Sequence, residues 1–360
     1  MPNFFRSLER APRINELHYW ADYVELNCLA SPDHLYAPSQ LSVYLRRARD
    51  TGDANEASTQ GDDILDDQTI DRLLGMNNDQ GPDLPTGQPS WDADLDERTT
   101  DGDDQLTGAA LSDSYSRRID DIWRHLRYRA AAFGEDWPFT IDGVTGAVGI
   151  SQPLTQGQQL YLFLLTCSAL KYDPELSTPT LTRMFERVSH LAFIKVFPGW
   201  EAHIFGTAAA AGSRYAIGKL WDRLVLLSQD LRTNLLVSEE DISPHDVGDN
   251  GLDLVAWLPL PDKSKGLPMA FGQCACGAGT WRAKQGEVSE DRWGETIKLS
   301  SPIQNWTFIP FCYHGPQGDW EAPLHVYKGV LVDRLRMLHI LKSGLEPVLE
   351  LLAPLDLANI

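Results

Sequence analysis

The chain has 360 residues, enough for one large domain or two ordinary ones with a real core. Apolar residues make up 42% and charged residues 23%, so the composition excludes a wholly disordered chain and a coiled coil. The net charge is −20, but sixteen of the acidic residues lie between Asp53 and Asp104. The acidity is therefore local, and by itself it neither indicates nor excludes a nucleic-acid partner.

The sequence has no apolar run of the roughly 18 residues that a membrane-spanning helix needs. Charges interrupt the apolar residues of the first segment, MPNFFRSLERAPRINELHYW, so we expect no signal peptide. Five cysteines, an odd number, do not indicate a disulfide framework. We therefore expect a cytoplasmic protein that does not associate with membranes.

The first third of the chain divides into two unlike segments. Residues 1–50 carry apolar side chains at helical spacing and are expected to be helical. Residues 51–108 are rich in Asp, Gly, Asn, Gln and Pro, and we expect a disordered or loosely ordered acidic insertion, with helical spacing only over Ile64–Gly75. The insertion is interpreted as a solvated linker, with an acidic mimic that occupies a nucleic-acid groove as the alternative.

The rest of the chain predicts a helical region over 109–178 and an α/β (α+β) region over 179–360. The Gly/Ala-rich segment His203–Ala216 is expected to allow close packing or close backbone approach near the functional site. The expected elements share either helical or alternating apolar spacing: a hairpin over Phe139–Ser151, helices over Leu160–Tyr172, Leu181–Phe197 and Ala216–Leu231, strands over Gly251–Leu260, Leu267–Cys276 and Asn305–His314, a short helix over Thr280–Glu287, and closing helices over Val330–Leu341 and Leu345–Leu352.

Three polar residues of this region point to metal chemistry. Asp253 stands at the start of an apolar strand, where a buried acid needs a partner. If the next strand pairs with the first, Gln273 meets Asp253 at one edge of the sheet, and the short helix can bring Lys284 over it. Oxygen ligands and an ammonium group at one strand end are typical of a Mg²⁺ site that acts on phosphate.

GDNGLD followed by a strand ending in FGQ resembles the PD-(D/E)xK, restriction-endonuclease-like nucleases, most closely the Mrr-like branch. The resemblance covers about Leu181 to Tyr313. It implies a central mixed sheet flanked by helices in α-β-β-β-α-β order, a nuclease domain over 179–360, and metal and second-motif positions at Asp253 and Gln273. FER on the preceding helix is similar to the family's acidic helix, which implies Glu186 as a third site residue.

The sequence departs from the family at its lysine. That residue normally stands two positions after the Gln, where this chain has Ala275. We expect Lys284 to substitute from the helix, with Arg282 as the other candidate cation and Asp249 as a second-choice ligand. Ordinary alternatives remain for each residue: a solvated helix face for Glu186, a surface position for Lys284 and a turn cap for Asp253.

The resemblance implies hydrolysis of phosphodiester bonds by a Mg²⁺- or Mn²⁺-dependent endonuclease. One or two ions held by Glu186, Asp253 and the Gln273 carbonyl would polarise the phosphate, and Lys284 would orient water or offset charge. DNA is the expected substrate, with RNA as the alternative, and the expected setting is prokaryotic defence against foreign DNA. The weak basic footprint predicts a protein partner from the same system or self-association.

The acidic insertion is expected to keep the nuclease off DNA until it is activated. Deletion of residues 51–108 should then raise basal cleavage. The alternative from another class is a catalytically inactive nuclease fold that serves as an interaction module in a multi-protein complex.

A competing set uses softer ligands. Cys274-x-Cys276 and Cys312-x-His314 would present four zinc ligands if each pair lay on a strand, because residues i and i+2 face the same way. Buried core cysteines are the preferred interpretation, since C-x-C is poor zinc spacing and free cysteines are commonly buried. G-x-S-x-G, P-loop and dinucleotide-binding fingerprints are absent from the sequence.

Overall fold

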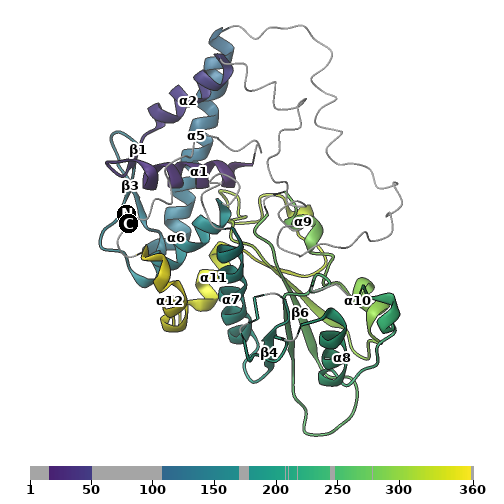
Figure 1. Cartoon of the computed structure of the whole chain (residues 1–360). Coiled ribbons are helices and arrows are strands. Elements are labelled where there is room, and N and C mark those ends of the chain that lie inside the picture. Colours follow the sequence, from purple (N-terminus) through teal and green to yellow (C-terminus); the bar gives the residue numbers. More distant parts are fainter. Residues whose placement is uncertain are drawn as a thin grey trace, which may run out of the picture.

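The computed structural model describes residues 16–50, 108–169, 178–206, 208–209, 211–216, 218–243, 248–277 and 279–357. The predicted acidic insertion over 51–108, including the helix expected over Ile64–Gly75, lies outside these residues apart from Gly108, with which α5 begins. The described part is a mixed α/β structure with about ten α-helices and a five-stranded mixed sheet (Figure 1).

The first part of the structure is helical with a small antiparallel sheet of order β1-β3-β2. Its elements are α1 (Leu17–Ala30), β1 (Leu35–Tyr36), α2 (Pro38–Asp50), α5 (Gly108–Phe133), β2 (Phe139–Ile141), β3 (Val148–Ile150) and α6 (Gln156–Ser168). The predicted hairpin is confirmed by the β2–β3 pairing, whereas β1 is too short to leave a signal in a helical pattern. Helix α6 begins with a capping box between Thr155 and Gln158, which satisfies two backbone N–H groups at its start.

The five-stranded sheet has the order β4-β5-β6-β7-β8. The strands β4, β5 and β6 pair antiparallel, and β6, β7 and β8 pair parallel. The elements of this part are α7 (Thr178–Val196), β4 (Glu201–Ile204), α8 (Leu220–Asp230), β5 (Leu254–Trp257), β6 (Met269–Cys274), α9 (Trp281–Lys284), α10 (Glu290–Thr296), β7 (Ile303–Phe308), β8 (Val330–Val332), α11 (Arg334–Leu341) and α12 (Glu346–Leu352).

Two strands of this sheet were not predicted. Strand β4 lies at the start of the Gly/Ala-rich segment, and its four residues alternate polar and apolar over too short a stretch to stand out as a strand. Strand β8 occupies the beginning of the helix expected over Val330–Leu341. That helix begins only at Arg334, because the Asp333 side chain accepts a hydrogen bond from the backbone N–H of Arg336 and so caps it.

The sheet is covered on both faces (Figure 1), with α7 and α11 on one side and α8 and α10 on the other. Alternate residues of β5 belong to the two buried clusters, as the two-residue period of a strand requires. Leu254 and Ala256 lie in the cluster that includes α7 and α11. Val255 and Trp257 lie in the cluster that includes α8 and α10. Burial on both faces explains why this strand is apolar throughout.

Buried ion pairs join the helical part to the end of the chain. The guanidinium of Arg129 on α5 lies 2.7 Å from Asp22 and 2.9 Å from Glu25, both on α1. Arg334 at the start of α11 lies 3.0 Å from the same Asp22 carboxylate. All four side chains are almost fully buried, so each charge depends on its partners. Among the described helices, none combines the length and apolar character needed to cross a membrane.

Candidate active site

The antiparallel pairing of β5 and β6 brings the predicted Asp253 and Gln273 to the same edge of the sheet. Leu254 is opposite Gly272, so Asp253, one residue before β5, lies next to Gln273. The backbone N–H of Asp253 donates to the carbonyl of Gly272 at 3.1 Å. The Asp253 carboxylate in turn accepts the backbone N–H of Cys274 at 2.6 Å through Oδ2. This places one carboxylate oxygen firmly and leaves the other available.

The end of strand β4 forms one wall of the site. The backbone N–H groups of Phe205 and Gly206 lie 2.7 and 3.3 Å from the carbonyl oxygen of Asp253. A Cβ atom on Gly206 would sit 3.1 Å from Oδ1 of Asp253 and 3.2 Å from Oδ2 of Asp249. Both carboxylates therefore face the same small space beside Gly206, and a side chain there would intrude on it.

Three buried acids share this region. Glu186, Asp249 and Asp253 are each only 3–5% exposed. The pKa of Glu186 is raised from 4.5 to about 8, mainly because the side chain is buried and, to a smaller extent, because the Asp249 carboxylate lies nearby. The pKa of Asp253 is raised well above its ordinary value, mainly by burial and then by the negative charges of Glu186 and Asp249. Burial also raises the pKa of Asp249. Charge on one acid therefore disfavours charge on the others.

Lys284 lies close enough to act on all three acids. Its positive charge lowers the pKa values of Glu186, Asp249 and Asp253, and so partly offsets the effect of burial. The structure thus brings Lys284 to the acids from the short helix α9, which the sequence predicted over Thr280–Glu287.

Neighbouring residues hold α9 in place and direct the other candidate cation elsewhere. The Trp281 side chain is fully buried, and the Gln285 amide donates to the carbonyl of His325 at 2.8 Å. Arg282 pairs with Glu16 and lies 3.1 Å from the ring nitrogen of His325. Of the two cations that the sequence offered on this helix, Lys284 is therefore the one at the acids.

Two buried oxygens at the site have no hydrogen-bond partner among the described residues. They are Oε2 of Glu186 and Oε1 of Gln273, and both side chains are more than nine-tenths buried. A buried acceptor without a donor costs about 1–3 kcal/mol. A bound cation would satisfy both oxygens, and a set made only of carboxylate and amide oxygens suits a hard ion such as Mg²⁺ or Mn²⁺.

The spacing of the acids limits how an ion would be held. Within the described residues, the only three His, Cys, Asp or Glu side chains with donor atoms all within 4.8 Å of one another are Cys312, His314 and Asp333. In the candidate site, the carboxylate oxygens of Glu186, Asp249 and Asp253 do not all lie within 4.8 Å of one another. An ion would therefore take one or two of them directly and complete its shell with water, as Mg²⁺ commonly does in proteins.

The sequence ranked Asp249 below the other acids and indicated Gly206 only as part of the Gly/Ala-rich segment His203–Ala216, expected to pack closely near the site. In the turn GDNGLD, Asn250 and Gly251 both have positive φ, at 55° and 74°. This turn carries Asp249 and Asp253 to the same side, and the Asp249 side chain accepts the backbone N–H of Gly251 at 2.9 Å. The Asn-Gly pair between two acids is the sequence signal for this geometry, because both residues tolerate positive φ.

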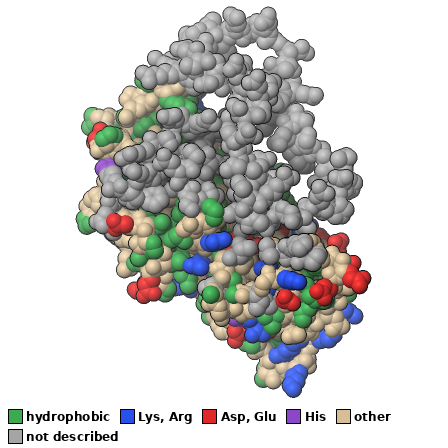
Figure 2. Space-filling model, in the orientation of Figure 1, with side chains coloured by type: hydrophobic (Ala, Val, Ile, Leu, Met, Phe, Trp, Pro, Cys, Tyr) green, Lys and Arg blue, Asp and Glu red, His purple; other side chains and the backbone are tan. Residues whose placement is uncertain are grey.

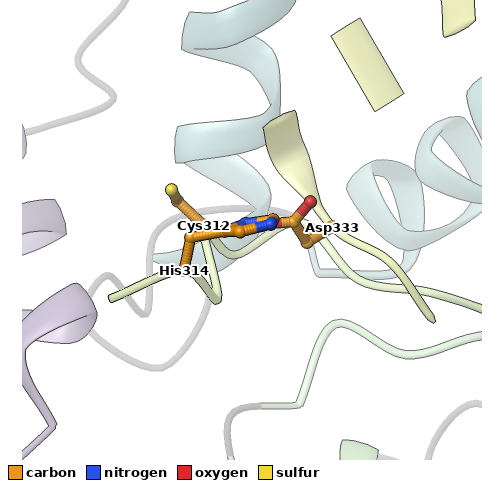
Figure 3. Close-up of side chains that lie close together, drawn as sticks. All are labelled: Cys312, His314 and Asp333. Carbon is orange, nitrogen blue, oxygen red and sulfur yellow. The ribbon is translucent and has the colours of Figure 1, made fainter. Parts of the chain in front are cut away.

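The predicted four-ligand zinc set is not assembled in the described part of the chain. Cys274 ends β6 and Cys276 follows it, while Cys312 and His314 lie beyond the end of β7. Neither pair therefore lies on a strand, and the expected same-side geometry is lost. Instead, Cys312 and His314 are grouped with Asp333 (Figure 3).

Within the group of Cys312, His314 and Asp333, the histidine and the aspartate are bonded to each other. The Nδ1 atom of His314 lies 2.7 Å from Oδ2 of Asp333, which also accepts the backbone N–H of Tyr313 at 3.0 Å. Figure 3 shows the imidazole directed at the carboxylate, with the sulfur of Cys312 on the opposite side. Burial raises the pKa of the Cys312 thiol to about 12, so it stays protonated. This arrangement anchors the loop before β8 to the start of α11.

Comparisons of this chain with protein-family models, with curated proteins and with solved structures give no match. On the face shown in Figure 2, the Lys and Arg side chains of the described residues are interspersed with Asp and Glu instead of forming a continuous basic band.

Proposed function

We propose that this protein is a metal-dependent endonuclease that hydrolyses phosphodiester bonds in DNA, with a restriction-endonuclease-like core of the PD-(D/E)xK type. The observation that carries the proposal is a group of three buried acids, two of whose carboxylates face the space beside Gly206, with Lys284 close enough to act on all three. Within the described part of the chain, one oxygen of Glu186 and one of Gln273 lack donors there. Acids with raised pKa values at one site are costly to fold and are typical of functional sites.

The order of elements supports the nuclease-like core. Helix α7 precedes the antiparallel strands β4, β5 and β6, with helix α8 between β4 and β5, and helices α9 and α10 then lead to β7, which pairs parallel to β6. Apart from the additional helix α8, this order is compatible with the α-β-β-β-α-β order that the sequence resemblance implies. Asp253 directly before β5, Gln273 on β6 and Glu186 on α7 are the residues for which the resemblance implies site positions.

The chain's own groups account for most of the proposed chemistry. A bound Mg²⁺ or Mn²⁺ would act as a Lewis acid on the phosphate and lower the pKa of a bound water. Asp253, Glu186 and Gln273 would supply oxygen ligands, with Asp249 facing the same space. The Lys284 ammonium would offset negative charge that develops on the phosphate, and a fixed cation does this without reorganisation.

Cleavage of supercoiled plasmid DNA in the presence of Mg²⁺ or Mn²⁺ tests this proposal. We expect cleavage by the wild-type protein, loss of cleavage on chelation, and loss in Asp253→Asn and in Lys284→Ala. Labelled single-stranded RNA in the same assay tests the alternative substrate. Metal binding without cleavage of either nucleic acid would contradict the nuclease assignment and favour the inactive interaction module.

The proposed setting is the cytoplasm of a prokaryote, with the protein as an effector of defence against foreign DNA. The interspersed surface charges in Figure 2 support a dependence on a protein partner or on self-association for holding nucleic acid. An electrophoretic mobility assay at low and moderate salt, with the protein at increasing concentration, tests whether DNA binding rises with self-association.

A further inference from the structure

Arg223 is a buried cation next to the candidate site. It lies on α8, on the same face as Leu220, Leu224 and Leu227, which pack in the apolar cluster behind the sheet. Its side chain is only 3% exposed. A guanidinium in such a place is costly unless its N–H groups find acceptors.

The acceptors that Arg223 uses belong to the two backbone segments that form the acidic site. Its Nη1 donates to the carbonyl of Phe205 at 2.9 Å, and its Nη2 donates to the carbonyl of Gly248. Each of these residues directly precedes a wall of the site, since Gly206 follows the first and Asp249 follows the second. The guanidinium also lies over the Phe205 ring, 5.4 Å from its centroid.

We propose that Arg223 is a positioning residue of the acidic site. By joining two backbone carbonyls, its guanidinium holds the Gly206 and Asp249 segments in place beside Asp253. This inference rests on the proposed function, because the segments need fixed positions only if their oxygens bind an ion.

The planar shape of the guanidinium explains why arginine is needed here. Its N–H groups diverge in a fixed fork, so one side chain can hold two acceptors at a set separation. A lysine in the same place would keep the charge and most of the aliphatic stem. Its single ammonium would not fix two carbonyls in the same way.

Arg232 provides a matched control. Its guanidinium also donates to two backbone carbonyls, those of Leu260 at 2.8 Å and Ser264 at 3.3 Å. Both acceptors lie in the loop between β5 and β6, at the opposite end of these strands from Asp253. A variant at this position loses two hydrogen bonds of the same kind, at a more exposed place, together with a pairing to Asp262 at 3.7 Å, without touching the acidic site.

The test is isothermal titration of the full chain with Mn²⁺, below the unfolding temperature of each variant. Binding by the wild-type protein and its loss in Asp253→Asn first establish the ion site. We then expect Arg223→Met to weaken Mn²⁺ binding by about 10- to 100-fold, as loss of a residue that orients metal ligands does. Arg223→Lys should recover only part of this loss, and Arg232→Met should bind as the wild type does.

The outcomes separate the two proposals. Failure of the wild-type protein to bind Mn²⁺ would overturn the proposed function and this inference with it. Wild-type binding with equal affinity in Arg223→Met and Arg232→Met would overturn the positioning role alone. Full recovery of Mn²⁺ affinity in Arg223→Lys would also overturn it, because a positive charge without the planar guanidinium would then be sufficient. If Arg223→Met does not fold, the comparison of Arg223→Lys with the wild type decides.

Discussion

The Asp253 carboxylate is fixed by the backbone N–H of Cys274, which lies 2.6 Å from Oδ2 on the neighbouring strand. This hydrogen bond uses one oxygen for structure and turns the other, Oδ1, toward the space beside Gly206. A carboxylate held in this way keeps one oxygen in a constant position for a ligand. The structural and the proposed chemical roles of Asp253 are thus divided between its two oxygens.

Asp253→Asn should abolish measurable Mn²⁺ binding while the protein stays folded. The amide keeps the size of the side chain and an oxygen acceptor, but it removes the charge that attracts the ion. Isothermal titration measures the binding, and the thermal unfolding midpoint reports the fold. Asp291→Asn, which changes an exposed acid paired with Lys328, is the control and should bind as the wild type does. Equal binding by both variants would remove Asp253 from the site.

Gly206→Ala should weaken Mn²⁺ binding more than it changes stability. The added methyl would lie 3.1 Å from Oδ1 of Asp253 and 3.2 Å from Oδ2 of Asp249, in the space that these oxygens face. Gly143→Ala is the matched control, because a Cβ at Gly143 meets no atom within 4 Å. Competition with a fluorescent chelator measures the affinities. Unchanged affinity in Gly206→Ala would show that the ion does not use this space.

The metal-free protein should lose stability as the pH rises from about 5 to about 8. Burial raises the folded-state pKa of Glu186 from 4.5 to about 8, so the folded state binds more protons than the unfolded state in this window. The stability that Glu186 contributes is therefore fully present at a pH below its pKa in the unfolded state. It is lost as the pH rises to its pKa in the folded state. Saturating Mn²⁺ should reduce the loss, because it replaces the proton.

Urea unfolding at the two pH values, with and without Mn²⁺, measures this dependence. Glu186→Gln should flatten it in the metal-free protein, because the amide does not titrate. A metal-free wild type that becomes more stable toward about pH 8 would contradict the assigned pKa direction.

Asp22→Asn should destabilise the protein by about 3–5 kcal/mol, because it leaves two buried guanidinium groups without a full counter-charge. Asp22 lies 2.7 Å from Arg129 and 3.0 Å from Arg334, and these residues join α1 to α5 and α11. Asp121→Asn, which breaks an exposed pair with Arg124, should cost about 1 kcal/mol or less. Chemical denaturation gives both values. Similar small losses in the two variants would show that the buried pairs do not hold these helices together.

The sequence was most informative where the structure depends on local pattern. The strands β5 and β6 alternate between two apolar faces, and the loop over 258–268 that joins them carries the turn residues PDKSKG, so their pairing could be predicted. That pairing alone places Asp253 beside Gln273. The short helix that carries Lys284 was also predicted, whereas Glu186 was proposed only from the family resemblance because a helical acid is usually solvated.

The features that were missed depend on contacts between distant segments. Strand β4 is short and becomes a strand only by pairing with β5, from Glu201 opposite Trp257 to Ile204 opposite Leu254, far along the chain. Gly206 was indicated only as part of the Gly/Ala-rich segment expected near the site, and Arg223 carries no local signal for its position at the acids. In the sequence, Arg223 resembles any charged residue on the solvent face of an amphipathic helix. Only the fold shows that its guanidinium is buried and donates to two backbone carbonyls.

Anomalous diffraction from a crystal of the full chain soaked in Mn²⁺ tests the central claim most directly. We predict an anomalous peak at ligand distance, about 2.0–2.6 Å, from Oδ1 of Asp253, with Asp249 or Glu186 as a second ligand. A peak at Cys312, His314 and Asp333 with none at Asp253, or no ordered Mn²⁺ beside Gly206, would contradict it.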